Sequence, residues 1–388
     1  MLDLKRTAAV LFAALVLLPL VSCGGRGSAP IDEEEAYSCG HGVAAYIEGL
    51  YVYSCGTSDR KLMYLDLASV NEPDPLCFKP ECTHSDETCS ASIKSPSVYS
   101  CNGRLYFLAL DDGYEIGLFE MAPDGTGRRE FCRIPMLEGK DRKNYTAFIQ
   151  SGYAAFEITD IVDGAATYSY WLMDINKPKE APLLLSDDGD STYLLQSIRL
   201  GTLYAVRCSK DAGGESLVGF SVTTGEMRTV VEKWSRENAM HVQDGRLYWY
   251  APEEGFFSKD INTGETVKYR SADRATEYGM ALYDDRYVYF SNAFPALDAL
   301  GWVPKGERGI RVFDHEGRLK LFIPSDTEQT PYGIFPRMAA PEAIVFQEVS
   351  QQDGKPKWYL KKSDIETGSA ELIPIPGSGR PAGGGASN

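Results

Sequence analysis

Short apolar strands alternate with polar turns along almost the whole chain. One strand of the repeated phrase follows a Gly or Asp turn, as in EGLYVY (Glu48–Tyr53), NGRLYFL (Asn102–Leu108) and DGRLYWY (Asp244–Tyr250). A later strand ends in a polar turn, as in FSVTTGE (Phe220–Glu226), SKDINTGE (Ser258–Glu265) and KSDIETGS (Lys362–Ser369). Apolar and polar positions alternate within these strands, and no long helical period follows the N-terminal segment. The pattern therefore predicts a chain built almost entirely of short strands.

The repeat divides the body of the chain into units of four strands. We expect seven such units, over Val43–Pro80, Ser97–Pro135, Tyr145–Asp187, Thr192–Trp234, Ala239–Arg270, Glu277–Pro324 and Pro331–Pro376. Four antiparallel strands repeated at this spacing, without helices, predict an all-β fold, a β-propeller of seven four-stranded blades. Six or eight blades are the alternatives.

The antiparallel order also predicts where the links between strands lie. The first and third links of each blade fall on one face of the disc, and the second links and the crossings between blades fall on the other. The two longest interruptions of the repeat, Phe78–Lys94 and Asn292–Gly309, are both expected on that second face. Binding residues tend to lie on irregular loops that a rigid scaffold positions. Phe294 and Trp302 are therefore candidates to contact a sugar ring or a peptide, with a local plug as the alternative.

The N-terminus has the features of an export signal. Lys5 and Arg6 precede the apolar run Ala8–Val21, which is too short to span a bilayer comfortably. The run ends in LVSC, which resembles the bacterial lipobox and implies cleavage before Cys23 and lipidation of its sulfur. An ordinary signal peptide that happens to end in Cys is the alternative. We expect a signal peptide at 1–22, a flexible tether at 23–36, the propeller at 37–376 and a disordered tail at 377–388.

Composition limits the possible partners. The formal net charge is −16 and the sequence pI is about 4.8. Nucleic acids and anionic lipid surfaces bind through basic patches, so an acidic body argues against both as partners. The lipid on Cys23 would instead tie the protein to the outward side of the bacterial cell membrane.

The sharpest local motif lies in the first interruption, where Cys77-x4-Cys82-x-His84-x4-Cys89 brings three thiols and an imidazole into thirteen residues. Such a set can close a tetrahedral zinc site. The chain has 9 Cys, and the even number that remains after lipidation of Cys23 also suits disulfides on an exported protein. Free thiols are the third alternative. In each case we expect a loop staple and not a catalytic centre, because three thiolates leave no obvious open position on a metal.

This Cys-rich element, which follows a YLD strand, resembles uncharacterised exported lipoproteins of gut anaerobic Firmicutes. Those proteins carry propeller-like repeats similar to YWTD-type propellers. The resemblance implies a fold and a compartment, and it carries no activity onto any residue of this chain.

No catalytic motif is present, neither a G-x-S-x-G elbow nor H-E-x-x-H nor a phosphate-binding loop. His241 and His315 are isolated in sequence from other ligands and are given no role, and the Tyr248–Tyr250 rings are expected to pack in the core. The sequence favours a binding or scaffold protein that holds a protein, peptide or glycan. An assembly factor for envelope proteins, which would resemble known propeller lipoproteins, and a polysaccharide-degrading enzyme are the alternatives.

Overall fold

The computed structural model describes most of the chain from residue 44 onward. The described ranges are 44–56, 60–69, 71–77, 79–84, 88–93, 95, 97–110, 116–133, 141–162, 165–186, 191–209, 214–236, 238–252, 254–273, 280–292, 308–324, 334–348, 355–369 and 371–377. The chain forms two units, Met1–Asp32 and Glu33–Asn388, and all described residues belong to the second. Within these ranges, no helix combines the length and the apolar character that crossing a membrane requires.

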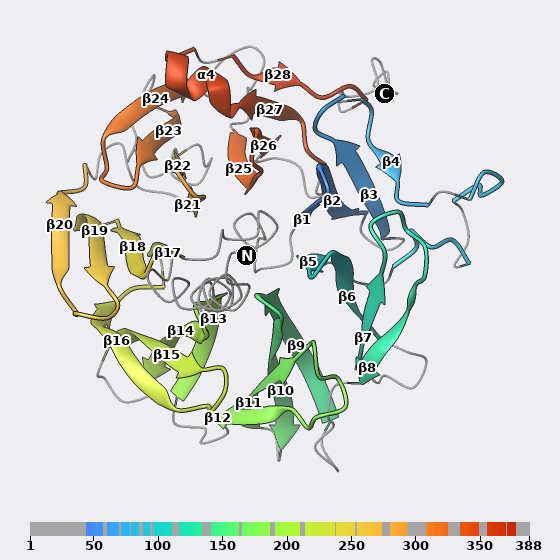
Figure 1. Ribbon diagram of the computed structural model, residues 1–388, viewed down its shortest axis with the longest axis horizontal. Helices are drawn as coiled ribbons and strands as arrows, with labels where there is room; N and C mark the ends of the chain where they lie inside the picture. The colour runs from blue at the N-terminus through green and yellow to red at the C-terminus, as the bar shows by residue number, and fades with distance from the viewer. Residues whose placement is uncertain are drawn as a thin grey trace, which may run out of the picture. The chain divides into compact units, whose positions relative to one another are not determined.

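Seven four-stranded antiparallel sheets surround a common centre as the blades of a β-propeller (Figure 1). Each sheet uses four strands that are consecutive in sequence. The predicted all-β fold with seven four-stranded blades is confirmed. The innermost strands are β1 (Ala44–Ile47), β5 (Tyr99–Cys101), β9 (Asp141–Gln150), β13 (Ser191–Arg199), β17 (Ala239–Gln243), β21 (Met280–Tyr283) and β25 (Ile334–Ala339). The second strands are β2 (Leu50–Cys55), β6 (Arg104–Leu110), β10 (Tyr153–Val162), β14 (Thr202–Ser209), β18 (Arg246–Ala251), β22 (Tyr287–Ser291) and β26 (Ala343–Glu348).

The outer half of each blade completes the sheet. The third strands are β3 (Lys61–Asp66), β7 (Ile116–Met121), β11 (Ala165–Asp174), β15 (Glu215–Ser221), β19 (Gly255–Asp260), β23 (Gly309–Asp314) and β27 (Trp358–Lys361). The outermost strands are β4 (Asp74–Pro75), β8 (Arg129–Arg133), β12 (Leu183–Ser186), β16 (Met227–Trp234), β20 (Thr266–Arg270), β24 (Leu319–Pro324) and β28 (Ile373–Pro374).

The repeated turn residues fix the register of the inner hairpins. In blades 1 to 5, the turn between the first two strands has positive φ at both central residues, with φ of 48–54° at the first and 68–83° at the glycine. These pairs are Glu48-Gly49, Asn102-Gly103, Ser151-Gly152, Leu200-Gly201 and Asp244-Gly245. This is the type I′ geometry, whose twist matches that of the flanking strands. The phrase that identifies the repeat is therefore a structural requirement of the hairpin.

Neighbouring blades pack through alternate side chains of the same strand. In β18, the Trp249 ring lies 5.9 Å from that of Trp234 in blade 4, whereas the Tyr250 ring lies 5.2 Å from that of Phe290 in blade 6. Because successive side chains of a strand point to opposite faces of the sheet, both faces of the blade are buried. The expected core packing of these rings is confirmed.

The ring closes without a shared strand. Among the described residues, blade 1 consists of β1–β4 and blade 7 of β25–β28, so no described strand from one end of the chain completes the sheet of the other. Tyr51 and Tyr53 of blade 1 instead join one buried cluster with Ile344 and Phe346 of blade 7. Side-chain packing at this junction therefore holds the two ends of the propeller together.

One outer link differs from the predicted polar turn. The KSDIETGS segment forms a short helix, α4 (Lys362–Thr367), which ends at Gly368 with φ of 71°. In the corresponding link of blade 5, the Asp260 carboxylate accepts hydrogen bonds from the backbone N–H groups of Asn262 (2.9 Å) and Thr263 (2.8 Å), and the chain turns at once. The glycine that follows supplies the left-handed conformation in both cases.

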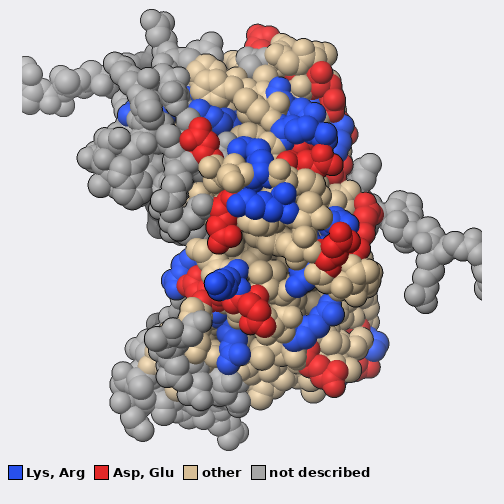
Figure 2. All heavy atoms as spheres, turned by 90° about the vertical axis from the view of Figure 1, so that its left-hand side faces the viewer, with Lys and Arg blue, Asp and Glu red and all other residues tan. Residues whose placement is uncertain are grey.

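Charges of both signs are interleaved on the side of the propeller that Figure 2 shows. Close ion pairs in blades 6 and 4 include Arg318 with Asp314 at 2.6 Å and Arg236 with Glu215 at 2.5 Å. This side therefore presents no extended surface of one sign, which a partner of high opposite charge would need.

Candidate metal centre

The Cys-rich element is an excursion from the outer edge of blade 1. The backbone N–H of Leu76 donates to the carbonyl of Leu62 (2.9 Å), and the N–H of the same Leu62 donates to the carbonyl of Ala91 (2.8 Å). The chain thus leaves the edge of β3 after Leu76 and rejoins it at Ala91, and the next pair continues through Ile93 and Arg60 (2.9 Å). Cys77–Ser90, the excursion, lies between these two points.

This path refines the predicted location, because the excursion leaves at the Leu62 end of β3, beside the link from β2, but runs outward from there. The sequence places the Phe78–Lys94 interruption on the face that carries the crossings between blades. In the structure the excursion starts from the sheet edge and projects outward from the disc beside the turn between β7 and β8 (Figure 1). An ideal Cβ on Gly125 in that turn would meet the backbone of Leu76, so the two segments are in close contact. The motif therefore belongs to the rim at the junction of blades 1 and 2.

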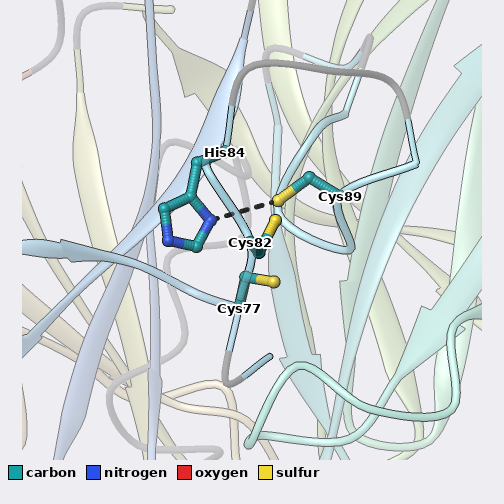
Figure 3. A group of neighbouring side chains, drawn as sticks. All are labelled: Cys77, Cys82, His84 and Cys89. Carbon is teal, nitrogen blue, oxygen red and sulfur yellow. Dashed lines mark hydrogen bonds between the residues drawn. The ribbon is translucent and has the colours of Figure 1, made fainter. Parts of the chain in front are cut away.

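The four predicted donor side chains converge. One donor atom from each of Cys77, Cys82, His84 and Cys89 lies within 4.8 Å of the other three, and Nδ1 of His84 is 3.4 Å from Sγ of Cys89 (Figure 3). Cys77 and Cys89 are buried, whereas Cys82 and His84 are partly exposed. The group thus has a closed side against the blades and an open side toward solvent.

Tight local turns bring these donors together. The N–H of Cys82 donates to the carbonyl of Lys79 (3.1 Å), and the N–H of Ser92 donates to the carbonyl of Cys89 (3.0 Å). His84 takes a φ of 56°, in the left-handed region that a non-glycine residue seldom adopts. These turns reverse the chain twice within the excursion, so residues from both of its ends face one point.

The environment makes one thiol much more acidic than another. Burial opposes ionisation of Cys77, but hydrogen bonds with the Ser90 side chain, the Lys79 backbone and the neighbouring thiols outweigh it and lower its pKa to about 6. Burial raises the pKa of Cys89 to about 11, and the neighbouring Cys82 and Cys77 add to that rise. Without a cation, the site therefore holds a single thiolate readily and opposes a second one.

The donor set fits a zinc ion. Tetrahedral Zn–S bonds of about 2.3 Å and Zn–N bonds of about 2.0 Å place two sulfurs about 3.8 Å apart and a nitrogen about 3.5 Å from a sulfur. The observed distance of 3.4 Å from His84 to Cys89 is close to the second value, and all four donor atoms lie within 4.8 Å of one another. A divalent cation would also remove the opposition to a second and third thiolate.

A disulfide would use this arrangement less completely. Cys77, Cys82 and Cys89 are free thiols in the structure. A disulfide needs two sulfurs about 2.05 Å apart and leaves the third thiol and the imidazole without a role. The predicted choice between metal and disulfide at these residues stays a prediction, and the convergence of four donors favours the metal.

The other predicted site residues fall outside the described ranges. Cys23, Phe294 and Trp302 belong to segments for which the structure gives no placement. The second interruption leaves the sheet after Ser291 of β22 and returns at Gly309 of β23. At this end of the two strands, Ser291 pairs with Ile310. Lipidation of Cys23 and ligand binding by Phe294 and Trp302 therefore stay predictions.

The structure also brings together residues that the sequence gave no role. The rings of His241 and His315 have centroids 5.6 Å apart, and Tyr248 lies 4.8 Å from His315. Nε2 of His315 is 2.9 Å from the backbone carbonyl of Asp284, to which it donates. No spacing in the sequence could reveal this group, because His315 comes from blade 6 whereas His241 and Tyr248 come from blade 5.

Comparison with known proteins finds no family and only distant structural likenesses. No protein family model and no curated protein sequence matches the chain. A prolyl endopeptidase is 14% identical, with a TM-score of 0.48 over 82% of this chain and 45% of that one, so this chain spans less than half its length. The designed protein Ika8 is 13% identical (TM-score 0.44; 84% and 87% covered), and TolB from Acinetobacter baumannii is 11% identical (TM-score 0.37; 70% and 63% covered). The propeller assignment therefore rests on the seven sheets themselves. The resemblance to Firmicutes lipoproteins stays a prediction.

Proposed function

We propose that this protein is an exported, lipid-anchored β-propeller that acts as a binding module, and that Cys77, Cys82, His84 and Cys89 hold a structural zinc ion on its rim. The observation that supports the zinc centre most is the convergence of four donor atoms within 4.8 Å of one another. Four protein ligands fill a tetrahedral zinc site, so the ion would fix the excursion and would not activate a water molecule.

The need for such a staple follows from the position of the excursion. Its ends are held by main-chain hydrogen bonds to one residue of β3, Leu62, and none of the described residues between them belongs to a sheet. A loop of this kind has few buried contacts of its own. A metal bound from Cys77 at one end to Cys89 at the other would order the whole segment.

A binding role, and not a catalytic one, agrees with the sequence. The blades repeat a structural phrase, and no known catalytic motif interrupts it. Propellers hold ligands on irregular segments of a rigid scaffold, and this chain has two such interruptions. The export and anchoring part of the proposal rests on the n-region, the apolar run and Cys23. The ligands proposed from the sequence are a protein, a peptide or a glycan.

Metal analysis combined with a thiol count tests the centre. We expect about one zinc per full-length chain, which is lost in C82S and in H84A and retained in C132S, because Cys132 lies in β8 away from the motif. Thiols of the motif should become reactive only after chelation. Metal-free protein in which two motif thiols are missing from the count would establish a disulfide instead. Fractionation of cells that express the wild type or C23A tests the anchor separately, since only the wild type should stay with the membrane.

A further inference from the structure

A cavity of about 510 Å³ lies between the excursion and blade 2. One wall consists of Lys79, Thr88, Cys89 and Ser90, and the opposite wall comes from the link between β7 and β8, including Arg128. Pockets of this volume take ligands of the size of a sugar or a short peptide. The cavity adjoins the proposed metal centre through Cys89, but its other walls are separate from the donor set.

Arg128 is held in place without a carboxylate partner. Its guanidinium lies 5.2 Å from the ring centroid of Phe107 and 5.9 Å from that of Phe119, and it donates a hydrogen bond to the carbonyl of Ser92. No Asp or Glu of the described residues forms an ion pair with it. The stack and the single carbonyl bond fix the plane of the group and leave most of its five N–H donors available.

The other arginines of blade 2 behave differently. Arg104 and Arg129 both form ion pairs with the buried Glu120, at 3.0 Å and 2.5 Å. Both guanidinium groups thus share one carboxylate partner within the blade. Arg128, by contrast, lines a cavity and pairs with no described carboxylate, in a protein whose net charge is −16. Its charged neighbour in the cavity is Cys89, whose thiolate form would favour the guanidinium charge.

Lys79 supplies a second cation on the opposite wall. Its Nζ makes one long hydrogen bond, 3.4 Å, to the carbonyl of Thr88, and forms no ion pair with a described residue. Two of the three hydroxyl groups that line the cavity already have partners. Thr126 donates to Asp124 (2.6 Å), and Ser90 bonds to Cys77. Recognition in this cavity therefore depends on the two cations.

We propose that this rim cavity binds an oxyanion, the phosphate, sulfate or carboxylate group of a small ligand, between Arg128 and Lys79. The planar guanidinium can donate two parallel hydrogen bonds to two oxygens of such a group, and the ammonium adds a point charge from the other side. The inference deepens the proposed binding function and rests on it in one respect, because a metal-ordered excursion would hold the wall that carries Lys79.

Titration of the full-length protein, extracted in detergent, tests the rim cavity. The probes are glucose 6-phosphate, glucuronate and glucose at low ionic strength, where weak charge interactions are least screened. We expect at least one of the two anionic probes to bind, to compete with inorganic phosphate, and to exceed glucose at least tenfold in affinity. The phosphate and carboxylate probes show which source of the oxyanion the cavity prefers. Equal binding of glucose would overturn the proposal.

Matched variants separate binding from folding. R128Q is expected to lower the affinity at least tenfold, and K79Q less. R270Q is the control, because Arg270 also stacks on two rings, Phe256 at 4.7 Å and Phe313 at 4.9 Å, but does not line the cavity. If R270Q weakens binding as much as R128Q, the proposal is wrong. R128K keeps the charge without the planar fork, so it should lower the affinity by less than R128Q. This variant tests the proposal even if R128Q fails to fold.

Metal content of the same samples distinguishes this inference from the proposed function. A wild type that binds metal and no anionic probe overturns the rim cavity and leaves the metal centre intact. A metal-free wild type that binds the phosphate probe through Arg128 supports the rim cavity and contradicts the metal centre. If R128Q loses its metal, the role of Arg128 is to stabilise the thiolates of the metal centre and not to bind a ligand. The oxyanion proposal is then overturned.

Discussion

Lys362 and Asp284 form a buried ion pair that joins the last two blades. Nζ of Lys362, the first residue of α4, lies 2.6 Å from Oδ2 of Asp284, and the two side chains are only 2% and 1% exposed. The other carboxylate oxygen accepts the backbone N–H groups of Arg286 (2.8 Å) and Tyr287 (2.7 Å). The hydroxyl of Tyr289 donates to Oδ2 as well (2.7 Å). The burial of this carboxylate is thus compensated by one cation and three donors.

Removal of the cation should destabilise the protein strongly. K362M leaves Asp284 charged and buried without its partner, which costs about 3–5 kcal/mol in the free energy of unfolding. Urea unfolding at neutral pH measures the loss. The control is K361M, because Lys361 is the exposed neighbour of Lys362 and its replacement should change stability by less than about 0.5 kcal/mol. Equal effects of the two variants would show that the pair adds nothing.

His241 should make the folded protein sensitive to mild acid. Burial, and then the neighbouring His315 and Arg199, lower the pKa of His241 to about 3. In the unfolded chain the same imidazole has a pKa of about 6.5. Its contribution to stability is therefore complete above about pH 6.5 and is lost as the pH falls from there toward 3, where only the unfolded state takes up the proton.

The H241Q variant isolates this contribution. Between pH 7 and pH 5 the wild type should lose about 2 kcal/mol of stability through His241 that the variant does not lose. Urea unfolding at several pH values gives the two slopes, and between pH 7 and 9 the slopes should coincide. A wild type and a variant with parallel slopes below pH 6.5 would contradict the neutral, buried state of this imidazole.

The sequence predicts those features that local rules determine. The period of the strands and the Gly-containing turn pairs, such as Asp244-Gly245, depend only on neighbours in sequence, so the blades could be counted without a structure. The outward path of the excursion depends on the hydrogen bonds that Leu62 accepts from Leu76 and donates to Ala91, which no local pattern encodes. Arg128 was missed for the same reason, because only blade packing places it against the excursion.

Removal of the metal should loosen the rim and leave the propeller folded. Chelation or C82S would free Cys77–Ser90, while the sheet of blade 1 keeps its own hydrogen bonds from β1 to β3. Hydrogen exchange measured by mass spectrometry should speed up in peptides that cover the excursion and stay unchanged in β13–β16 of blade 4. The C132S variant, treated with the same chelator, should show the same local change as the wild type. Faster exchange throughout the protein would instead make the metal a requirement for the whole fold.

A single turn residue offers a gain in stability. Leu200 occupies the first central position of a type I′ turn with φ of 50°, and its side chain is 63% exposed. A left-handed conformation costs an ordinary residue roughly 1–2 kcal/mol, and Asn before Gly is the preferred pair in this turn. L200N should therefore raise the free energy of unfolding by about 1 kcal/mol, as measured in urea. L194N in β13 is the control, since Leu194 is similarly exposed, at 37%, but belongs to an extended strand, where Asn is disfavoured. If both variants lower stability, the turn carries no strain that Asn can relieve.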